Sequence, residues 1–434
     1  MSAAIGQAVR RKEDLRLITG AGRYSDDVNM PGQAYAYMVR SPHAHARIRA
    51  IATRQAFAQP GVIAVLTGAD ALADGLRPIP HSTALSSPPD ILLKNRDGSP
   101  YPIMSHALLP VDRARFVGEA VAMVIAETVH AAMDAVERVE VDYELLLCVT
   151  GAPAAVEASV PMLHDGFANV CIDADVGDVA ATNEAFARAA HVVRLTTWVQ
   201  RVTGVPMEPR AAVACYDPAT SRYWLHAGSG GIVRQKGELA GILGVPPAAV
   251  RVTANEIGGN FGTRNAFFPE FGLIAWASKR IGPPVKWTCE RHEAFLSDYQ
   301  GRDLTVEAEL ALDANGHFLA LRGSDLSNVG AHSVSYVPLI KGVGLMTSVY
   351  QVPAAHIRAR AVLSNTAPTN PYRSAGRPEA MFVIERLISI AARRYGFDEV
   401  ELRRRNLIPK SAMPYAAGPD LRQRRLWADH GPGA

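Results

Sequence analysis

The sequence predicts a globular protein of the α/β (α+β) class, and three observations support this prediction. Short apolar runs of strand type alternate with helical patterns along most of the chain. Apolar residues make up 48% and charged residues 20% of the sequence, as is typical of proteins that bury large cores. The length of 434 residues corresponds to two or three domains at roughly 150 residues each.

The N-terminal part of the chain predicts a polar lead-in over residues 1–17 and an α/β domain over residues 18–150. Strands are expected over 33–39, 62–66, 120–126 and 139–143, a helix from Thr67 to Asp74, and a helix over 129–137 capped by Thr128. Residues 77–109 hold many Pro and Ser residues and little periodicity. We expect this segment to be a long surface excursion.

Residues 151–170 are rich in Ala, Pro and Gly and are the best candidate for a linker. A second domain is expected over residues 171–410, followed by an atypical tail over residues 411–434. In the second domain the expected strands are 192–199, 211–216, 223–226, 250–254 and 284–289, with a hairpin of 305–312 and 317–325 around Asn315-Gly316. Its expected helices are 232–243, 270–280, 379–395 and a last short helix that Asp398 and Glu401 begin.

The first of two unusual loops lies between an expected strand and an expected helix. It reads Ile257-Gly258-Gly259-Asn260-Phe261-Gly262-Thr263-Arg264. Three glycines allow a sharp turn and a close approach to a ligand, and the following helix offers free N–H groups to an anion. Arg264 would add a fixed positive charge.

The second loop, residues 370–379, opens the long helix. Pro378 suits the first helical turn, and Arg373 and Arg377 flank the positive end of the helix. Together the two loops suit a ligand that carries several phosphates. Each loop alone is more simply a tight turn with a solvated arginine, because neither matches the nucleotide-binding fingerprints GxxxxGK[ST] and GxGxxG.

The cysteines and the charge exclude several other classes. The cysteines Cys148, Cys171, Cys215 and Cys289 lie far apart and form no CxxC pair, so we expect no iron–sulfur cluster or structural zinc in this chain. Scattered free thiols are typical of a cytoplasmic protein. The net charge of +3 indicates neither a nucleic-acid nor a membrane partner, and the longest apolar run, residues 120–126, is too short for a membrane span.

Five motifs, in this order and spacing, resemble the molybdenum-binding large subunits of the xanthine dehydrogenase and aldehyde oxidase family, which includes carbon monoxide dehydrogenase-like proteins. The motifs are Ile5-Gly6 with Arg11, Asp14, Gly20, Gly22 and Tyr24; Phe116-Val117-Gly118-Glu119-Ala120-Val121-Ala122; Met207-Glu208-Pro209-Arg210; Gly258-Gly259-Asn260-Phe261-Gly262; and Tyr372-Arg373-Ser374-Ala375-Gly376-Arg377-Pro378. The resemblance implies an N-terminal hammerhead-type domain followed by the first molybdopterin-binding domain.

The resemblance also implies a cofactor, a reaction and partners. The cofactor would be molybdenum molybdopterin in its cytosine dinucleotide form, without a direct protein ligand to the metal. The reaction would insert a water-derived oxygen at an electron-poor carbon of an aldehyde or N-heteroaromatic substrate. Electrons would leave through an iron–sulfur small subunit with [2Fe-2S] clusters to an FAD-binding medium subunit. Cofactor-binding residues would be Gly258, Gly259, Asn260, Phe261, Gly262, Arg373 and Ser374, and substrate-facing residues Asn265 and Ala375.

Several positions depart from the family pattern. Ser374 stands where carbon monoxide dehydrogenases carry a copper-binding cysteine, so oxidation of CO is not expected. Residues 228–231 read Gly-Ser-Gly-Gly where many relatives have a glutamine near the molybdenum, and Ala375 replaces an aromatic residue that clamps purines.

The resemblance implies that the general-base glutamate would belong to a second cofactor domain, which residues 411–434 do not resemble. Glu208 is expected to be structural. We therefore expect an incomplete, truncated chain, with a non-catalytic partner-docking remnant as the alternative. Phosphate or nucleic-acid binding through the arginine-bearing loops is a third, weaker hypothesis.

Overall fold

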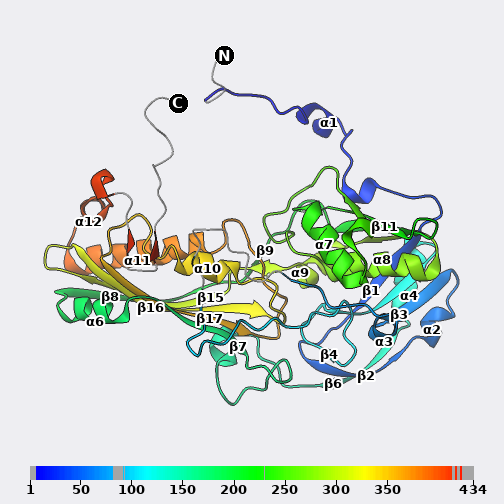
Figure 1. Ribbon diagram of the computed structural model, residues 1–434, viewed down its shortest axis with the longest axis horizontal. Coiled ribbons are helices and arrows are strands. Elements are labelled where there is room, and N and C mark those ends of the chain that lie inside the picture. The colour runs from blue at the N-terminus through cyan, green and yellow to red at the C-terminus, as the bar shows by residue number, and fades with distance from the viewer. Residues whose placement is uncertain are drawn as a thin grey trace.

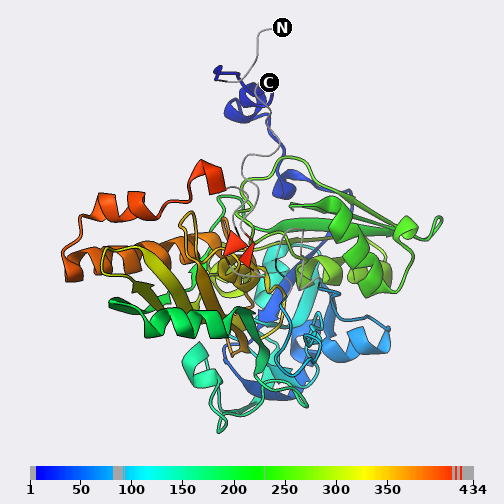
Figure 2. The same ribbon diagram turned by 60° about the vertical axis from the view of Figure 1, so that its left-hand side comes forward.

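The computed structural model describes residues 6–81, 91, 93–228 and 230–412, together with the backbone of residues 416–417 and 421–422. Helices and strands are mixed throughout these ranges, which confirms the predicted α/β (α+β) class. The molecule has two lobes that meet near α9 (Arg291–Ser297) and β9 (Val202–Thr203), as Figure 1 shows. The turned view in Figure 2 shows the same division. Within the described part of the chain, no helix is long and apolar enough to cross a membrane.

One lobe is built on a seven-stranded sheet. Its strands, in spatial order, are β12 (Val250–Thr253), β11 (Arg222–Ala227), β10 (Ala211–Asp217), β13 (Val285–Thr288), β1 (Ala34–Arg40), β5 (Ala120–Ala126) and β3 (Val62–Thr67). Every residue of β5 is buried, because this strand has apolar neighbours on both faces. Met123 and Ile125 belong to the core that includes α8 (Pro269–Ile281), whereas Val121 and Val124 belong to a smaller core. Burial on both faces explains the unbroken apolar run of β5.

Two of the helices of this lobe begin at the caps that the sequence predicts, Thr67 and Thr128. The helices of the lobe are α2 (Arg54–Phe57), α3 (Gly68–Ala73), α4 (Val129–Val136), α7 (Ile232–Leu243) and α8. The side chain of Thr128 accepts a hydrogen bond from the N–H of Ala131 at the start of α4, and Thr67 forms a capping box with Asp70 at the start of α3. A three-stranded sheet, β4 (Arg113–Ala114), β2 (Ala46–Ala52) and β6 (Glu140–Leu145), completes the lobe.

The other lobe is built on a five-stranded sheet. Its spatial order is β7 (Val170–Gly177), β17 (Ala354–Leu363), β16 (Phe318–Gly330), β15 (Leu304–Leu312) and β8 (His191–Val199). The predicted hairpin is confirmed, because β15 and β16 pair antiparallel across the turn at Asn315 and Gly316. The long helix α11 (Arg377–Tyr395) lies on one face of the sheet and α6 (Val179–Ala187) on the other (Figure 1).

The remaining elements are short. They are α1 (Asp14–Ile18), η1 (Ser25–Asp27), α5 (Ala152–Ala155), η2 (Pro247–Ala249), β14 (Gln300–Gly301), α10 (Val337–Val343), α12 (Glu399–Asn406), η3 (Lys410–Ala412), β18 (Ala416–Ala417) and β19 (Leu421–Arg422). The start of α12 is as expected, because the carboxylate of Asp398 accepts hydrogen bonds from the N–H groups of Val400 and Glu401.

The two expected domains are joined more closely than the sequence indicates. Strands β1, β5 and β3 from the first pair into the same sheet as β10 to β13 from the second. The expected linker, residues 151–170, contains α5, whose Ala152 and Ala155 pack against Leu326 and Val362 of the five-stranded sheet. The division at residues 150 and 171 therefore stays a prediction.

The expected surface excursion, residues 77–109, is partly buried, which corrects the prediction. Residues 82–90 and 92 lie outside the described ranges, but Ile79, Leu108 and Leu109 belong to the core of the seven-stranded lobe. The Pro and Ser content of the segment indicated its lack of regular structure and not its exposure. Apolar side chains at both ends of the segment hold it against the protein by packing into this core.

The same segment contributes to a buried cluster of four histidines and one glutamate at the junction of the lobes. The Nε2 atom of His81 lies 2.8 Å from Nδ1 of His106, whose ring stacks on His332 at 4.0 Å. The Nε2 atom of His332 lies 3.1 Å from a carboxylate oxygen of Glu119, and the ring of His164 packs edge-on against His332. Burial lowers the pKa of each of these histidines, that of His81 to about 3, and raises the pKa of Glu119 to about 7.

Candidate functional site

The two unusual loops lie against each other where the lobes meet. We call residues 257–264 the glycine loop and residues 370–379 the arginine loop. The N–H of Arg373 donates to the carbonyl oxygen of Phe261 over 2.8 Å. The side-chain amide of Asn370 donates to the carbonyl oxygens of Gly262 and Thr263, each over 3.2 Å. The sequence predicts both loops but not that they touch.

The backbone of the glycine loop needs glycine for two reasons. The φ angle is +93° at Gly262 and +121° at Gly259, values that side chains with a Cβ rarely adopt. A Cβ at Gly262 would also lie 2.4 Å from the carbonyl oxygen of Pro371, and one at Gly258 would lie 2.5 Å from Cβ of Glu208. Close packing against the rest of the protein therefore fixes these positions.

Glu208 anchors the start of the glycine loop. Its carboxylate accepts hydrogen bonds from the N–H of Gly258 over 2.7 Å and from the N–H of Ser25 over 3.0 Å. The side chain is buried, and both of its oxygens are occupied by backbone groups. This geometry fits the structural role that we expect for Glu208, because each oxygen of its carboxylate holds a backbone N–H group in place.

Arg264 does not supply the surface charge that the sequence predicts. Its residue is only 3% exposed, and its Nη2 atom lies 3.9 Å from the carboxylate of Asp298. Burial lowers the pKa of its guanidinium group. The chain turns inward after Gly262, because Ala266 and Phe267 enter the core, and this turn carries Arg264 inward with them.

Asp298 belongs to a buried ionic network beneath the glycine loop. Arg210 donates to Asp298 over 2.6 Å and to Glu270 over 2.8 Å, and Arg40 donates to Glu270 over 2.7 Å. Burial opposes ionisation of Glu270, but Arg210 and Arg40 outweigh it and lower the pKa to about 2. The network joins β1, β10, α8 and α9. The sequence gives no signal for it, because its members are far apart along the chain.

The arginine loop holds its residues in a strained conformation. Arg373 and Ser374 have φ angles of +29° and +65°, and each such residue costs about 1–3 kcal/mol. Both residues are exposed, whereas Ala375 is buried. Within the described ranges, the guanidinium group of Arg373 makes no hydrogen bond or ion pair of its own. It is therefore available to an anion near the start of α11.

The segment of residues 228–231 lies against the glycine loop. A Cβ at Gly230 would be 2.0 Å from Oδ1 of Asn265 and 2.6 Å from Nδ2 of Asn260. Ser229 lies outside the described residues. The side-chain oxygen of Asn260 accepts a hydrogen bond from the N–H of Gly262 over 2.7 Å. The side-chain nitrogen, Nδ2, is buried and has no hydrogen-bond partner in the described structure. An unpaired buried donor is costly, so this position fits an acceptor atom of a bound molecule.

Large apolar side chains surround the glycine loop on the surface. Met207 is 88% exposed and Val233 is 82% exposed, and Ile257 and Phe261 in the loop itself are also exposed. Glu208, next to Met207, is hydrogen-bonded to the glycine loop. Val233 follows residues 228–231, which pack on Asn260. An apolar rim of this kind is typical of a surface that binds another molecule.

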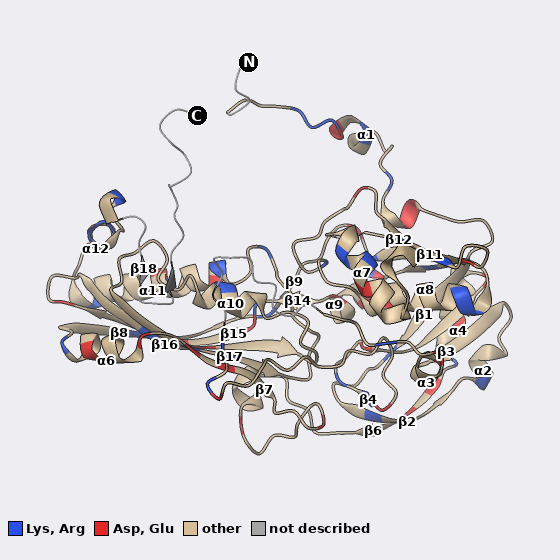
Figure 3. Ribbon diagram, in the orientation of Figure 1, with Lys and Arg blue, Asp and Glu red and all other residues tan. Residues whose placement is uncertain are grey.

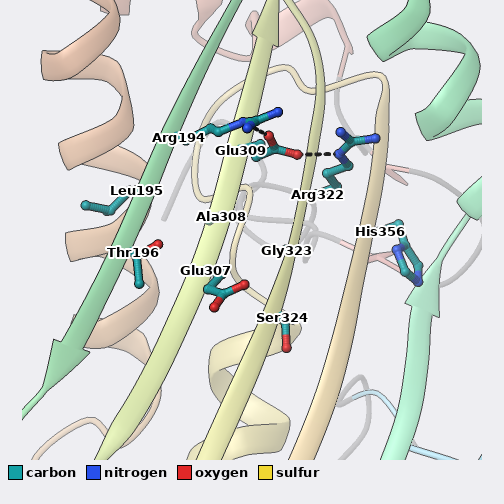
Figure 4. A pocket seen from close by; sticks show the side chains of 10 residues that line it. All are labelled: Arg194, Leu195, Thr196, Glu307, Ala308, Glu309, Arg322, Gly323, Ser324 and His356. Carbon is teal, nitrogen blue, oxygen red and sulfur yellow. Dashed lines mark hydrogen bonds and ion pairs between the residues drawn. The ribbon is translucent and has the colours of Figure 1, made fainter. Parts of the chain in front are cut away.

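A pocket on the five-stranded sheet is a weaker candidate for a functional site. Figure 4 shows Arg194 and Arg322 on either side of Glu309, with which both form ion pairs. Its lining also includes Glu307, Ser324 and His356. Because its main charges are paired with one another on an exposed sheet face, the pocket resembles an ordinary polar surface.

Charged residues are spread over both lobes without a large region of one sign, as Figure 3 shows. This distribution agrees with the small net charge and gives no support to a nucleic-acid-binding surface.

Two family models match the chain. The a/b hammerhead domain of aldehyde oxidase and xanthine dehydrogenase matches residues 19–146, and the molybdopterin cofactor-binding domain matches residues 163–407. The chain belongs to the xanthine dehydrogenase and aldehyde oxidase family. The resemblance expected from the five motifs is thereby confirmed, and the glycine loop and the arginine loop both lie inside the matched molybdopterin-binding domain.

Curated relatives and solved structures agree with this family. The chain is 35% identical to the 6-hydroxypseudooxynicotine dehydrogenase complex subunit gamma of Paenarthrobacter nicotinovorans, over 96% of this chain and 51% of that protein. It is 32% identical to the carbon monoxide dehydrogenase large chain of Hydrogenophaga pseudoflava, over 93% and 50%. The crystal structure of quinoline 2-oxidoreductase from Pseudomonas putida 86 superposes with a TM-score of 0.87 and 32% identity, over 97% and 52%. The chain spans about half the length of the curated relatives it matches.

Proposed function

We propose that this chain binds a molybdenum pterin cofactor between the glycine loop and the arginine loop, as part of a hydroxylase. The observation that carries this proposal is the contact between the two loops, which joins Arg373 to Phe261 inside the molybdopterin-binding domain. The hydroxylase would insert a water-derived oxygen at an electron-poor carbon. When bound, the cofactor supplies the centre that accepts two electrons from the substrate.

The residues of the site fit such a ligand. The unpaired Nδ2 of Asn260 offers a buried donor, and the unpaired guanidinium group of Arg373 offers a charge at the start of α11. These groups suit the pyrophosphate of a dinucleotide form, and we propose the cytosine dinucleotide. The proposed cofactor-binding residues are Gly258, Gly259, Asn260, Phe261, Gly262, Arg373 and Ser374.

The substrate is proposed to be an aldehyde or an N-heteroaromatic compound. The names of similar proteins, among them quinoline 2-oxidoreductase and nicotine 6-hydroxylase large subunit, favour the second class. Asn265, which is exposed beside Gly230, is a proposed substrate-facing residue. Ala375 is buried in this chain and keeps that role only as a proposal. We propose that the general base is a glutamate of a second cofactor domain.

The proposed partners are an iron–sulfur small subunit with [2Fe-2S] clusters and an FAD-binding medium subunit, in the cytoplasm. The relative from Paenarthrobacter nicotinovorans is itself called a complex subunit, which supports this assembly.

Molybdenum and pterin analysis tests the proposal. The chain would be coexpressed with the two partner subunits and a cofactor sulfurase, and purified under mild conditions. We expect about one molybdenum and one pterin per chain, and less than a tenth of this in the Asn260→Leu variant. A wild-type chain without molybdenum under these conditions would rule out cofactor binding.

The second candidate function is a non-catalytic partner-docking protein. The exposed apolar rim formed by Met207, Val233 and their neighbours favours it, because such a surface can bind a protein without any cofactor. A chain that copurifies with the partner subunits but contains no molybdenum or pterin would support this function over the first.

A further inference from the structure

Arg302 contacts the arginine loop at two points. Its Nη2 atom donates to the carbonyl oxygen of Arg373 over 3.2 Å, and its guanidinium group lies over the ring of Tyr372, 5.2 Å from the centroid. The preceding residue, Gly301, packs so closely that a Cβ there would lie 2.3 Å from Cβ of Tyr372. Residues 300–302 and 368–373 therefore run side by side.

The same guanidinium group also reaches the helix that follows the loop. Its Nη1 atom lies 2.6 Å from a carboxylate oxygen of Glu379, in the first turn of α11, and both side chains are largely buried. One cation thus joins the middle of the arginine loop to the helix that the loop opens. A flat guanidinium group can make these contacts at once, because its donors point in different directions in one plane.

A second buried carboxyl group accompanies this pair. Asp325 of β16 is 2% exposed, and its Oδ1 atom has no hydrogen-bond partner in the described structure. Burial and the nearby Glu379 raise the pKa of Asp325 to about 8. Asp325 therefore keeps its proton near neutral pH, and the ion pair of Arg302 with Glu379 has no second negative charge beside it.

The arginine loop needs such support. Arg373 and Ser374 both have positive φ angles, which the loop would leave if it were free. Two hydrogen bonds hold Arg373 in this conformation: its N–H donates to Phe261, and its carbonyl oxygen accepts from Arg302. Because both bonds use the backbone, the guanidinium group of Arg373 remains available.

We propose that Arg302 is a positioning residue, which holds the arginine loop in its strained conformation through Arg373 and Glu379 and so aims Arg373 at an anionic group of the cofactor. The part that concerns the cofactor rests on the proposed function. The part that concerns the loop does not. Arg302 itself touches no ligand in this proposal and acts through Arg373.

The test compares three variants of the full chain by hydrogen exchange and molybdenum content. Arg302→Met removes the charge and the donors, and Arg302→Lys keeps a charge beside Glu379 but lacks the second nitrogen that donates to the carbonyl oxygen of Arg373. Arg358→Met is the control, because Arg358 on β17 forms an ion pair with Asp173, at 2.8 Å, that involves neither loop. Exchange is measured at the amide of Arg373 in the chain without partners, and molybdenum in the coexpressed complex.

We expect exchange at the Arg373 amide to be at least tenfold faster in Arg302→Met and at least threefold faster in Arg302→Lys, and unchanged in the control. We expect molybdenum per chain to fall at least fivefold in Arg302→Met. Unchanged exchange in a folded Arg302→Met variant would overturn the proposal. If that variant does not fold, unchanged exchange in Arg302→Lys would do so.

The two proposals fail differently. A wild-type complex without molybdenum, combined with faster exchange in the Arg302 variants, would refute the proposed function but support the positioning role. Faster exchange with full molybdenum content would show that Arg302 holds the loop without serving the cofactor, and would overturn that part of the inference. A loss of thermal stability equal to that of the Arg358→Met control, without faster exchange, would indicate a merely structural ion pair.

Discussion

The N–H of Arg373 donates to the carbonyl oxygen of Phe261, although the two residues follow different strands in different lobes. This bond makes one site out of two loops, and Asn370 adds two more bonds between them. A change in either loop is therefore expected to affect both, which leads to the first two predictions.

Gly262→Ala should destabilise the protein more than Gly282→Ala does. Both glycines have similar φ angles, +93° and +98°, but a Cβ at Gly262 would lie 2.4 Å from the carbonyl oxygen of Pro371, whereas Gly282 has open space around it. We expect a difference of about 1–3 kcal/mol in the free energy of unfolding, measured with urea. Gly262→Val should also abolish cofactor retention without unfolding the N-terminal domain. Equal losses in the two alanine variants would show that the close contact does not matter.

Asn370→Ala should lower the free energy of unfolding by about 1–3 kcal/mol, because it removes the side-chain donor to the buried carbonyl oxygen of Thr263 and one of the two donors to that of Gly262. Asn370→Asp should cost more, since it places carboxylate oxygens against carbonyl oxygens. Urea unfolding of both variants shows which one loses more free energy of unfolding. An aspartate variant as stable as the wild type would contradict the hydrogen-bond assignment.

Local patterns in the sequence predict much of the fold. The helix over residues 232–243 has the bounds that its apolar periodicity indicates, and the Asn315-Gly316 turn joins the expected hairpin. These elements depend on interactions between residues close in the chain. The strand β2 is missed, because Arg47 and Arg49 interrupt its apolar character on the exposed face.

The site is less predictable than the fold. The sequence identifies both loops from their glycines and arginines, but it assigns Arg264 to the ligand when the structure buries this side chain beside Asp298. It also overlooks Asn370 and Arg302 as supports of the loops. Each error concerns contacts between segments far apart in the chain, where no spacing rule applies.

The substitution Glu119→Gln should change how the stability of the protein depends on pH. Its pKa is about 7 in the folded protein and near 4.5 in the unfolded chain, so the folded state binds more protons between these values. The contribution of Glu119 to stability therefore falls as pH rises from about 4.5 to 7. Glu119→Gln, which can still bond to His332, should become more stable relative to the wild type over this range, by up to about 3 kcal/mol.

Urea unfolding of both proteins at pH 5 and pH 7.5 measures this difference. The four buried histidines have lowered pKa values, so their contribution is present above about pH 6.5 and is lost as pH falls. Because both proteins retain these histidines, that effect largely cancels in the comparison. A stability difference that is the same at both pH values would contradict the buried, protonated Glu119.

Arg210→Met should be severely destabilising, by about 3–5 kcal/mol, because it leaves the carboxylates of Glu270 and Asp298 buried without their main cation. The matched control is Arg280→Met, which breaks the partly exposed ion pairs with Asp70 and Asp74 and should cost at most about 1 kcal/mol. Thermal and urea unfolding compare the two. Similar losses in both variants would mean that burial of the network has little effect.

The shared seven-stranded sheet limits how this protein can be divided. Strand β1 pairs in parallel with β13 through Ala34 and Val285, across the boundary that the sequence predicts. A fragment ending near residue 150 would expose the hydrogen-bonding edge of β1, and the complementary fragment would expose that of β13. Unprotected edges of this kind recruit other strands, so each fragment expressed alone should aggregate. Any shortened version of this protein must therefore keep the strands on both sides of this pairing.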